Sequence, residues 1–171
     1  MKHAWILVFM GLIIPTQAHA ATAKATIQGT GEGSKISGWA FFNDTDKGLE
    51  IKIDLFGAPP GTHGIHIHEK GSCADLGNGA GGHYNPDGVK HGMITKDGPL
   101  EAHMGDLGNI DIGPDGNGSI ATVVPQLTIS GGKYNVDGRT VIFHEKIDDF
   151  GQPTGNAGSR IGCGVIEAGA K

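Results

Sequence analysis

The histidines of this chain are gathered in one stretch of the sequence. Six of the nine lie between residues 63 and 106, in the segments THGIHIHEKGSC, GGHYNPDGVKHGM and EAHMGDLGNI. Neutral imidazole is the commonest metal ligand in proteins, and a single carboxylate often completes a zinc site. The first hypothesis is therefore a metal centre.

The later part of this stretch has the composition of a zinc site. Three histidines are followed by an aspartate three positions after the last of them: His83, His91, His103 and Asp106. Three imidazoles and one carboxylate make the closed tetrahedral sphere that structural zinc prefers. The alternative, a set of solvent-exposed loop histidines, is weaker because so many imidazoles seldom cluster by accident.

A second group belongs to strand-like segments. His66 and His68 are two positions apart, so both should project from one face of a strand while the intervening isoleucines face the core. His144, in the later segment TVIFHE, is a candidate to join them, and such a nitrogen-rich site suits copper(II). His63 has the opposite parity, so we expect a hydrogen-bonded structural histidine there and not a ligand.

Short alternating segments must position these residues. In the third of them, Leu49, Ile51, Ile53 and Leu55 alternate with polar residues, which is the period of a strand with one solvated face. No segment after residue 20 has a sustained helical period. We therefore predict an all-β sandwich or flattened barrel whose strands are 25–28, 36–42, 49–56, 63–69, 107–112, 119–125, 140–145 and 161–167.

The connections between these segments are short, with two exceptions. Residues 70–106 and 146–160 form loops of a length that is usually functional in a compact domain. Among the short connections, PDGNG between segments 107–112 and 119–125 predicts a hairpin turn.

Residues 1–20 have the three parts of a signal peptide. Lys2 is followed by an apolar run at 4–14 and a small-residue ending at Ala20. The run is too short to span a bilayer of about 30 Å, and a buried N-terminal helix is the weaker alternative. We expect the mature domain to comprise residues 21–171 and to be periplasmic or secreted.

Export changes the interpretation of the two cysteines. An oxidising compartment and an even count favour a disulfide between Cys73 and Cys163 over two buried thiols. A bridge that closes a loop of ~100 residues contributes about 4 to 5 kcal/mol in the chain-entropy model.

The charge of the chain argues against two classes of partner. The formal net charge is −5 and becomes −6 without Lys2. Neither nucleic acid nor an anionic membrane is therefore expected as a partner.

Five segments resemble the copper/zinc superoxide dismutase family: HGIHIHE, GGHYNP, HMGDLGN, GRTVIFHEKIDD and GNAGSRIGCGVI. They occur in the family's order and cover nearly all of the chain after residue 20. The resemblance implies an eight-stranded Greek-key β-sandwich or flattened barrel. It also implies a copper site and a zinc site that share His83, the copper ligands being His66, His68, His83 and His144 and the zinc ligands His83, His91, His103 and Asp106.

The resemblance gives roles to further residues. Asp148 would link a copper-ligand histidine to a zinc-ligand histidine, Arg160 would attract and orient superoxide beside the copper, and Thr154 would lie at the channel mouth. His83 would carry a proton to the product while copper alternates between Cu(II) and Cu(I). The implied reaction converts superoxide to dioxygen and hydrogen peroxide. The family contains homodimers and monomers, so a homodimer is one of the expected assemblies.

The sequence departs from the family pattern in its loops. The segment between His91 and His103 is longer than in the common eukaryotic forms, and the loop at 146–160 is shorter. Between Ile147 and Ser159 it has no Lys or Glu of the kind linked to steering, so we expect weak long-range guidance dominated by Arg160.

Two other functions are compatible with parts of the pattern. A non-catalytic exported copper or zinc carrier on the same fold could dispense with Arg160 or with some copper ligands, but this chain keeps the complete set. A zinc hydrolase needs an open zinc position, which three histidines and one aspartate would close.

Overall fold

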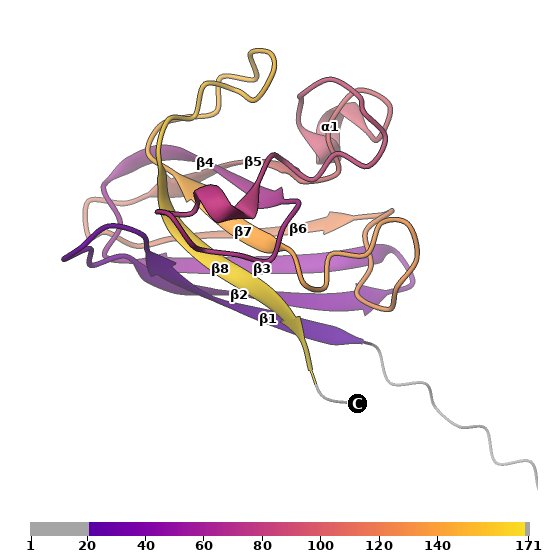
Figure 1. Ribbon diagram of the computed structural model, residues 1–171, viewed down its shortest axis with the longest axis horizontal. Coiled ribbons are helices and arrows are strands. Elements are labelled where there is room, and N and C mark those ends of the chain that lie inside the picture. The colour runs from indigo at the N-terminus through magenta and orange to yellow at the C-terminus, as the bar shows by residue number, and fades with distance from the viewer. Residues whose placement is uncertain (1–20, 170–171) are drawn as a thin grey trace, which may run out of the picture.

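The computed structural model describes residues 21–169, so the predicted signal peptide lies outside the described residues. The described part is almost entirely β (Figure 1). Its strands are β1 (Thr22–Gly29), β2 (Ser37–Thr45), β3 (Gly48–Phe56), β4 (Gly61–His68), β5 (Asp106–Ile112), β6 (Gly118–Val124), β7 (Thr140–His144) and β8 (Arg160–Ala168).

The eight strands form one antiparallel sheet in the order β5-β4-β7-β8-β1-β2-β3-β6, which curls into a nearly closed barrel. The predicted all-β class and all eight predicted strand positions are confirmed. Strand β4 pairs with β7, which comes more than 70 residues later in the chain, with Ile65 opposite Phe143. This long-range pairing is what brings the early and late histidines together.

Alternation explains why these segments form strands with one buried face. In β3 the side chains of Leu49, Ile51, Ile53 and Leu55 are 0% exposed, and Lys52 is exposed. Burying an aliphatic side chain of this size contributes about 1.5 to 3 kcal/mol. The apolar faces of all the strands meet inside the barrel.

Strands β4 and β7 are buried on both faces. Residues 63–68 of β4 and the whole of β7 are buried, because the loop 69–105 covers their outer side. This loop contains two short helices that the sequence did not predict, η1 (Asn78–Ala80) and α1 (Ile94–Asp97). Helices of a single turn are too short to leave a period in the sequence.

The predicted hairpin at PDGNG needs a correction. The turn forms, since the Gly113 N–H donates to the Asn117 carbonyl at 2.8 Å. However, β5 and β6 lie at opposite ends of the strand order and share no ladder. Strand β5 pairs with β4 and β6 with β3, so the turn joins the two free edges of the sheet across the seam of the barrel.

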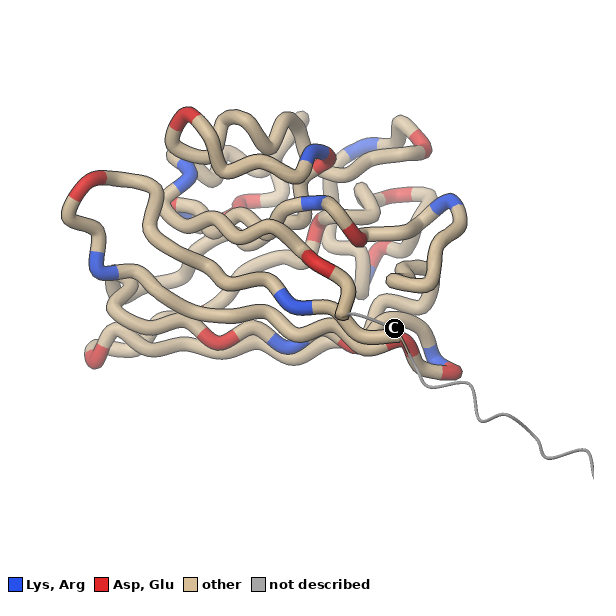
Figure 2. Tube along the Cα trace, turned by 60° about the horizontal axis from the view of Figure 1, so that its bottom comes forward, with Lys and Arg blue, Asp and Glu red and all other residues tan. Residues whose placement is uncertain are grey.

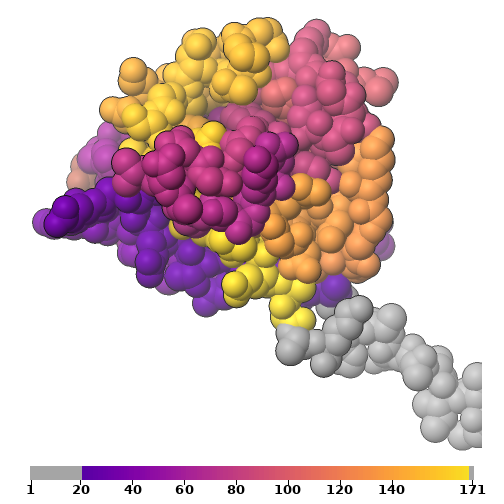
Figure 3. Space-filling model, in the orientation of Figure 1, coloured from indigo at the N-terminus to yellow at the C-terminus, as the bar shows by residue number. Residues whose placement is uncertain are grey.

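The long loops pack together on one side of the barrel. The loop that carries α1 and the loop 145–159 project from the same end (Figure 1), and the space-filling view shows them beside the segment 70–84 (Figure 3). The predicted disulfide is present and joins Cys73 of that segment to Cys163 of β8, with Cα atoms 5.8 Å apart. The described residues contain no helix long and apolar enough to span a membrane.

Candidate metal centre

Strand register brings the candidate ligands into neighbouring positions. On the outer side of the sheet His66 is paired with Asp106, and His68 with His83. The ladder between β7 and β8 shifts between Phe143 and His144, and the β4–β5 ladder shifts between Gly64 and His66. Such irregularities often occur beside active sites, where they redirect a side chain.

Two buried groups of potential ligands result. In each group one nitrogen or oxygen atom per residue lies within 4.8 Å of all the others. The first group contains four histidines, and the second contains three histidines and one aspartate. Their members are His66, His68, His83 and His144, and then His83, His91, His103 and Asp106.

In the first group, one ring nitrogen of each of three histidines is held by a hydrogen bond. His66 Nε2 donates to Asp148 Oδ2 at 2.8 Å, and His68 Nδ1 donates to the Gly81 carbonyl at 2.9 Å. His144 Nδ1 donates to the carbonyl of Gly158 at 3.3 Å. These bonds fix the orientation of each ring.

The other nitrogens of these rings have no hydrogen-bond partner among the described residues. His66 Nδ1, His68 Nε2 and His144 Nε2 are all buried. Leaving a buried polar atom unpaired costs about 1 to 3 kcal/mol. A cation placed among the three nitrogens would remove this penalty, and rings oriented by outer hydrogen bonds are typical of metal ligands. The residues therefore fit a copper ion.

In the second group, the three histidine nitrogens all lie close to the Asp106 carboxylate. Asp106 Oδ1 is 2.8 Å from His83 Nδ1 and 3.1 Å from His103 Nδ1. Asp106 Oδ2 is 2.8 Å from His91 Nδ1, but the two are not aligned for a hydrogen bond. Ligands of a tetrahedral zinc lie about 3.3 Å apart, so a small expansion of this group would admit zinc.

Asp148 connects the two groups. Its carboxylate accepts from Nε2 of His66, and both of its oxygens lie 3.0 Å from Nε2 of His91. Those nitrogens are the ones that point away from the two groups. The third cluster of potential ligands, His66, His91 and Asp148, is therefore best explained as a hydrogen-bonded bridge.

The first group favours neutral rings. Burial lowers the pKa of His68 to about 2 and that of His144 to about 3, and nearby imidazoles add to both effects. Burial also lowers the pKa of His83 to about 4, although Asp106 opposes this. A protonated imidazolium has no free nitrogen to ligate a metal, so His68 and His144 are already in a form that can bind one at neutral pH. His83, which belongs to both groups, would in addition have to give up its Nδ1–H proton to bind two metals.

The second group carries the charges. Burial would lower the pKa of His91, but close contacts with the carboxylates of Asp106 and Asp148 raise it to about 9. Burial would raise the pKa of Asp106, but contacts with His103, His83 and His91 hold it far below its usual value. The carboxylate therefore stays anionic, as a zinc ligand must.

Arg160 lies beside the first group. Its guanidinium donates to the carbonyls of Gly77 and Gly81, both at 2.7 Å. The Gly81 carbonyl also accepts from His68, which places the charge next to a candidate copper ligand. Arg160 is half-buried, and burial lowers its pKa from a very high starting value, so it stays protonated.

Two other predicted residues lie outside both groups. His63 is buried against Phe143, with its Nδ1 3.0 Å from the His144 carbonyl and its Nε2 2.9 Å from the Pro59 carbonyl. Thr154 is exposed in the loop 145–159.

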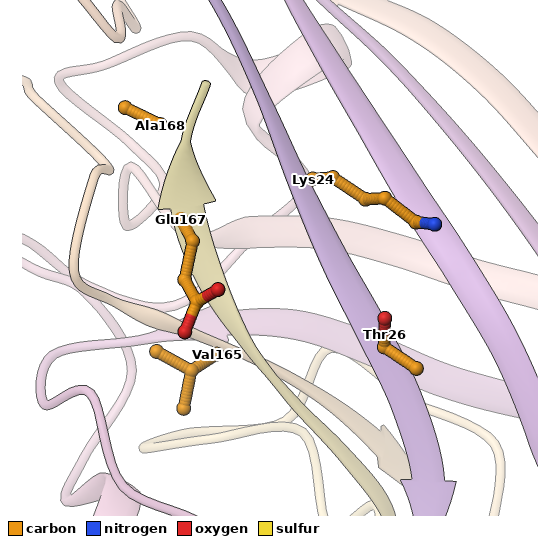
Figure 4. A pocket seen from close by; sticks show the side chains of 5 residues that line it. All are labelled: Lys24, Thr26, Val165, Glu167 and Ala168. Atoms are coloured by element: carbon orange, nitrogen blue, oxygen red, sulfur yellow. The ribbon is translucent and has the colours of Figure 1, made fainter. Parts of the chain in front are cut away.

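A shallow pocket on the outside of the barrel does not contribute to this centre. It has a volume of about 280 Å³ and lies between β1 and the end of β8 (Figure 4). Lys24 points away from Glu167 there, and its ammonium lies 5.6 Å from the Phe41 ring centroid. No histidine lines the pocket.

Comparison with known proteins identifies the family. The family model described as copper/zinc superoxide dismutase matches residues 36–166. The chain belongs to the copper/zinc superoxide dismutase family. The family's name contains two metals, and the structure has two buried groups of potential metal ligands.

Several dismutases resemble the chain over much of its length. It is 40% identical to extracellular superoxide dismutase [Cu-Zn] of Caenorhabditis elegans over 143 residues, covering 78% of this chain and 62% of that protein. It is 43% identical to the extracellular dismutase of Drosophila melanogaster, covering 72% and 70%. Superoxide dismutase [Cu-Zn] 2 of Aquifex aeolicus is 34% identical, with coverage of 91% and 93%.

A solved structure extends the likeness to the fold. The crystal structure of the clock protein EA4 superimposes with a TM-score of 0.77 and 31% identity, covering 98% of this chain and 99% of that one. The eight-stranded fold of the dismutase family is thus present.

Three side-chain amides support this dismutase centre and were not predicted from the sequence. Each binds both the N–H and the carbonyl of one backbone residue. Asn109 holds Asp148 (2.8 and 3.0 Å), Gln152 holds His91 (3.0 and 2.9 Å) and Asn85 holds Val89 (3.1 and 2.9 Å). Neither periodicity nor spacing signals such contacts, because each depends on how an irregular loop folds back on itself or against another segment.

Proposed function

We propose that the chain is an exported copper/zinc superoxide dismutase that converts superoxide to dioxygen and hydrogen peroxide. In this proposal the all-histidine group holds copper, and the group containing Asp106 holds zinc in a closed sphere. His83 belongs to both groups. Its Nδ1 faces Asp106, which leaves Nε2 for the copper side.

Copper, when bound, supplies the redox chemistry, accepting an electron from one superoxide and giving it to a second. Arg160 holds a permanent positive charge beside His68 and is in place to attract and orient the small anion. Nε2 of His83 can hold a proton and give it to the reduced product. Asp148 keeps His66 and His91 in orientation through their outer nitrogens.

One observation carries this proposal. The three buried, unpaired nitrogens of His66, His68 and His144 converge next to a fixed guanidinium. A carrier would need the nitrogens but not the guanidinium, and a hydrolase would need an open zinc position. A site for a redox metal beside a fixed positive charge is what an anionic redox substrate requires.

The decisive experiment measures dismutation by the purified mature protein at three stages: fully loaded, after selective removal of copper, and after copper is restored. We expect activity to vanish and return with copper while zinc stays bound. Activity that survives copper removal would refute the mechanism. Tight copper and zinc binding without dismutation at any stage would favour the carrier.

We also propose that residues 1–20 are removed on export, so that residues 21–171 act in the periplasm or outside the cell. The two animal relatives are named extracellular. Sequencing the N-terminus of the secreted protein should return Ala21 first.

Light scattering of the loaded protein distinguishes a homodimer from a monomer. We also expect the protein not to bind DNA or anionic vesicles.

A further inference from the structure

Gln152 reaches from the loop 145–159 to the backbone of a residue in the zinc group. Its Oε1 accepts from the His91 N–H at 3.0 Å, and its Nε2 donates to the His91 carbonyl at 2.9 Å. One exposed glutamine thus satisfies both backbone polar groups of a residue whose side chain is completely buried.

The backbone around His91 has one other side-chain support, since the Gly92 N–H donates to Asp106 Oδ2 at 3.0 Å. Residues 85–92 form neither helix nor strand, so no ladder fixes this segment. Just before His91 in the chain, the side chain of Asn85 binds the backbone of Val89. Backbone groups must find partners when they are removed from water. At Val89 and at His91 those partners are amide side chains. The amide at His91 is that of Gln152, in the loop 145–159.

Two contact points restrain His91 more than one would. The His91 N–H and carbonyl belong to the two peptide units on either side of its Cα, so the planar Gln152 amide restrains both units, whereas a single hydrogen bond would restrain only one. The direction of the His91 side chain depends on both units, and its Nδ1 lies 2.8 Å from Asp106 and its Nε2 3.0 Å from Asp148. A small rotation of either peptide unit would disturb both contacts.

We propose that Gln152 is a positioning residue for zinc, which it serves by fixing the backbone of His91. The proposal rests on the proposed function, in which His91 is a zinc ligand. The loop 145–159 would then stabilise bound zinc in two separate ways, through the Asp148 carboxylate and through the Gln152 amide. Partners outside the coordination sphere typically change metal affinity 10- to 100-fold.

The chemistry of glutamine suggests graded variants. Gln152→Met keeps the approximate length and removes both the donor and the acceptor. Gln152→Glu keeps an acceptor for the His91 N–H but has no donor for the carbonyl. Gln28→Met, at an exposed position of β1, makes the same chemical change away from the loops and serves as the matched control.

The test follows zinc release from the copper- and zinc-loaded protein to a coloured chelator, together with the visible spectrum of cobalt(II) placed in the zinc site. We expect Gln152→Met to release zinc about 10 to 100 times faster than the parent, with an altered cobalt spectrum. Gln152→Glu should be intermediate, and Gln28→Met should match the parent.

Parental zinc release and an unchanged cobalt spectrum in both Gln152 variants would overturn the proposal, even if their metal-free forms unfold more easily. If Gln152→Met does not fold, the Glu variant alone decides. The assignment of His91 as a zinc ligand is checked separately with His91→Ala. Full zinc retention in His91→Ala would overturn that assignment. Zinc loss in His91→Ala, with parental zinc release in the Gln152 variants, would overturn only the role of Gln152.

Discussion

Gly155 occupies a position next to the Asp148–His91 bridge where a side chain cannot fit. Its φ is +75°, and a Cβ there would overlap the Asp148 carboxylate and lie 2.6 Å from His91 Nε2. Glycine is therefore required twice, for the backbone conformation and for the space.

These two requirements can be separated by experiment. Gly138 has a φ of +73° but open space around its Cβ direction. We expect Gly155→Ala and Gly138→Ala both to lower the free energy of unfolding by roughly 1 to 2 kcal/mol, the cost of a left-handed non-glycine residue. Only Gly155→Ala should also weaken zinc binding about 10-fold or more, as measured by competition with a chelator. Equal zinc affinities in the two variants would show that the bridge tolerates displacement.

The residues that form the metal groups were predictable, and those that support them were not. His66 and His68 could be placed on one face of a strand by parity, His144 by its strand-like segment, and His83, His91, His103 and Asp106 by their spacing. That His83 belongs to both groups was implied only by the resemblance to the family. Asn109, in β5, and Gln152 and Gly155, in the loop 145–159, act through contacts that involve irregular loops. No local sequence pattern encodes such contacts, and an isolated amide or glycine in a loop resembles a surface residue.

At the scale of the element, Asp44 near the end of β2 caps a distant turn. Its carboxylate accepts from the Ile129 N–H at 2.8 Å and from the Thr128 hydroxyl and the Ser130 N–H, both at 3.0 Å. Burial opposes ionisation, but a hydrogen bond from the Ser130 hydroxyl, together with these three, holds the pKa of Asp44 below its usual value. The carboxylate thus joins the first strands to the loop before β7.

The sign of the pH effect follows from that lowered pKa. The contribution of Asp44 is present above the pKa of the unfolded chain, about 3.9, and is lost as pH falls through the lower folded value. We expect Asp44→Asn to cost about 1 kcal/mol at pH 7 and progressively less below pH 4. Urea unfolding of the metal-free protein measures this, with exposed Asp46→Asn as the control. A deficit that is the same at pH 7 and pH 3 would argue against the carboxylate cap.

The disulfide acts on the segment that holds Arg160. Cys73 and Gly77 are joined by a backbone hydrogen bond of 3.2 Å, and the Gly77 carbonyl accepts from the guanidinium. Replacing both cysteines with alanine should lower the free energy of unfolding by about 3 to 5 kcal/mol. We also expect a lower kcat/KM at equal copper content. Unchanged kcat/KM in the copper-loaded double variant would mean that Arg160 is held without the bridge.

At the scale of the whole molecule, basic and acidic residues are interspersed along the chain (Figure 2). The net charge is negative, and the proposed substrate, superoxide, is an anion. Between Ile147 and Ser159 the loop beside the copper group has no lysine or glutamate. Arg160 is therefore expected to be the main attraction for superoxide.

The dependence of the rate on ionic strength tests this expectation. Salt screens charges beyond about 10 Å at 0.1 M. The parent rate should fall only modestly between low and physiological salt, and Arg160→Ala should remove most of that fall along with most of the activity. A steep fall that persists in Arg160→Ala would point to other steering charges.

The pairing of β4 with β7 also sets the order in which the centre can form during folding. All members of the zinc group lie between residues 83 and 106, whereas the all-histidine group is incomplete until His144 pairs next to a strand made far earlier. Contacts so distant in sequence are slow to form, on the millisecond to second scale. In stopped-flow refolding of the metal-free protein with both metals supplied, we expect zinc capture to precede copper capture, because a chain interrupted before Thr140 already contains every residue of the Asp106 group but only three of the four histidines of the other group.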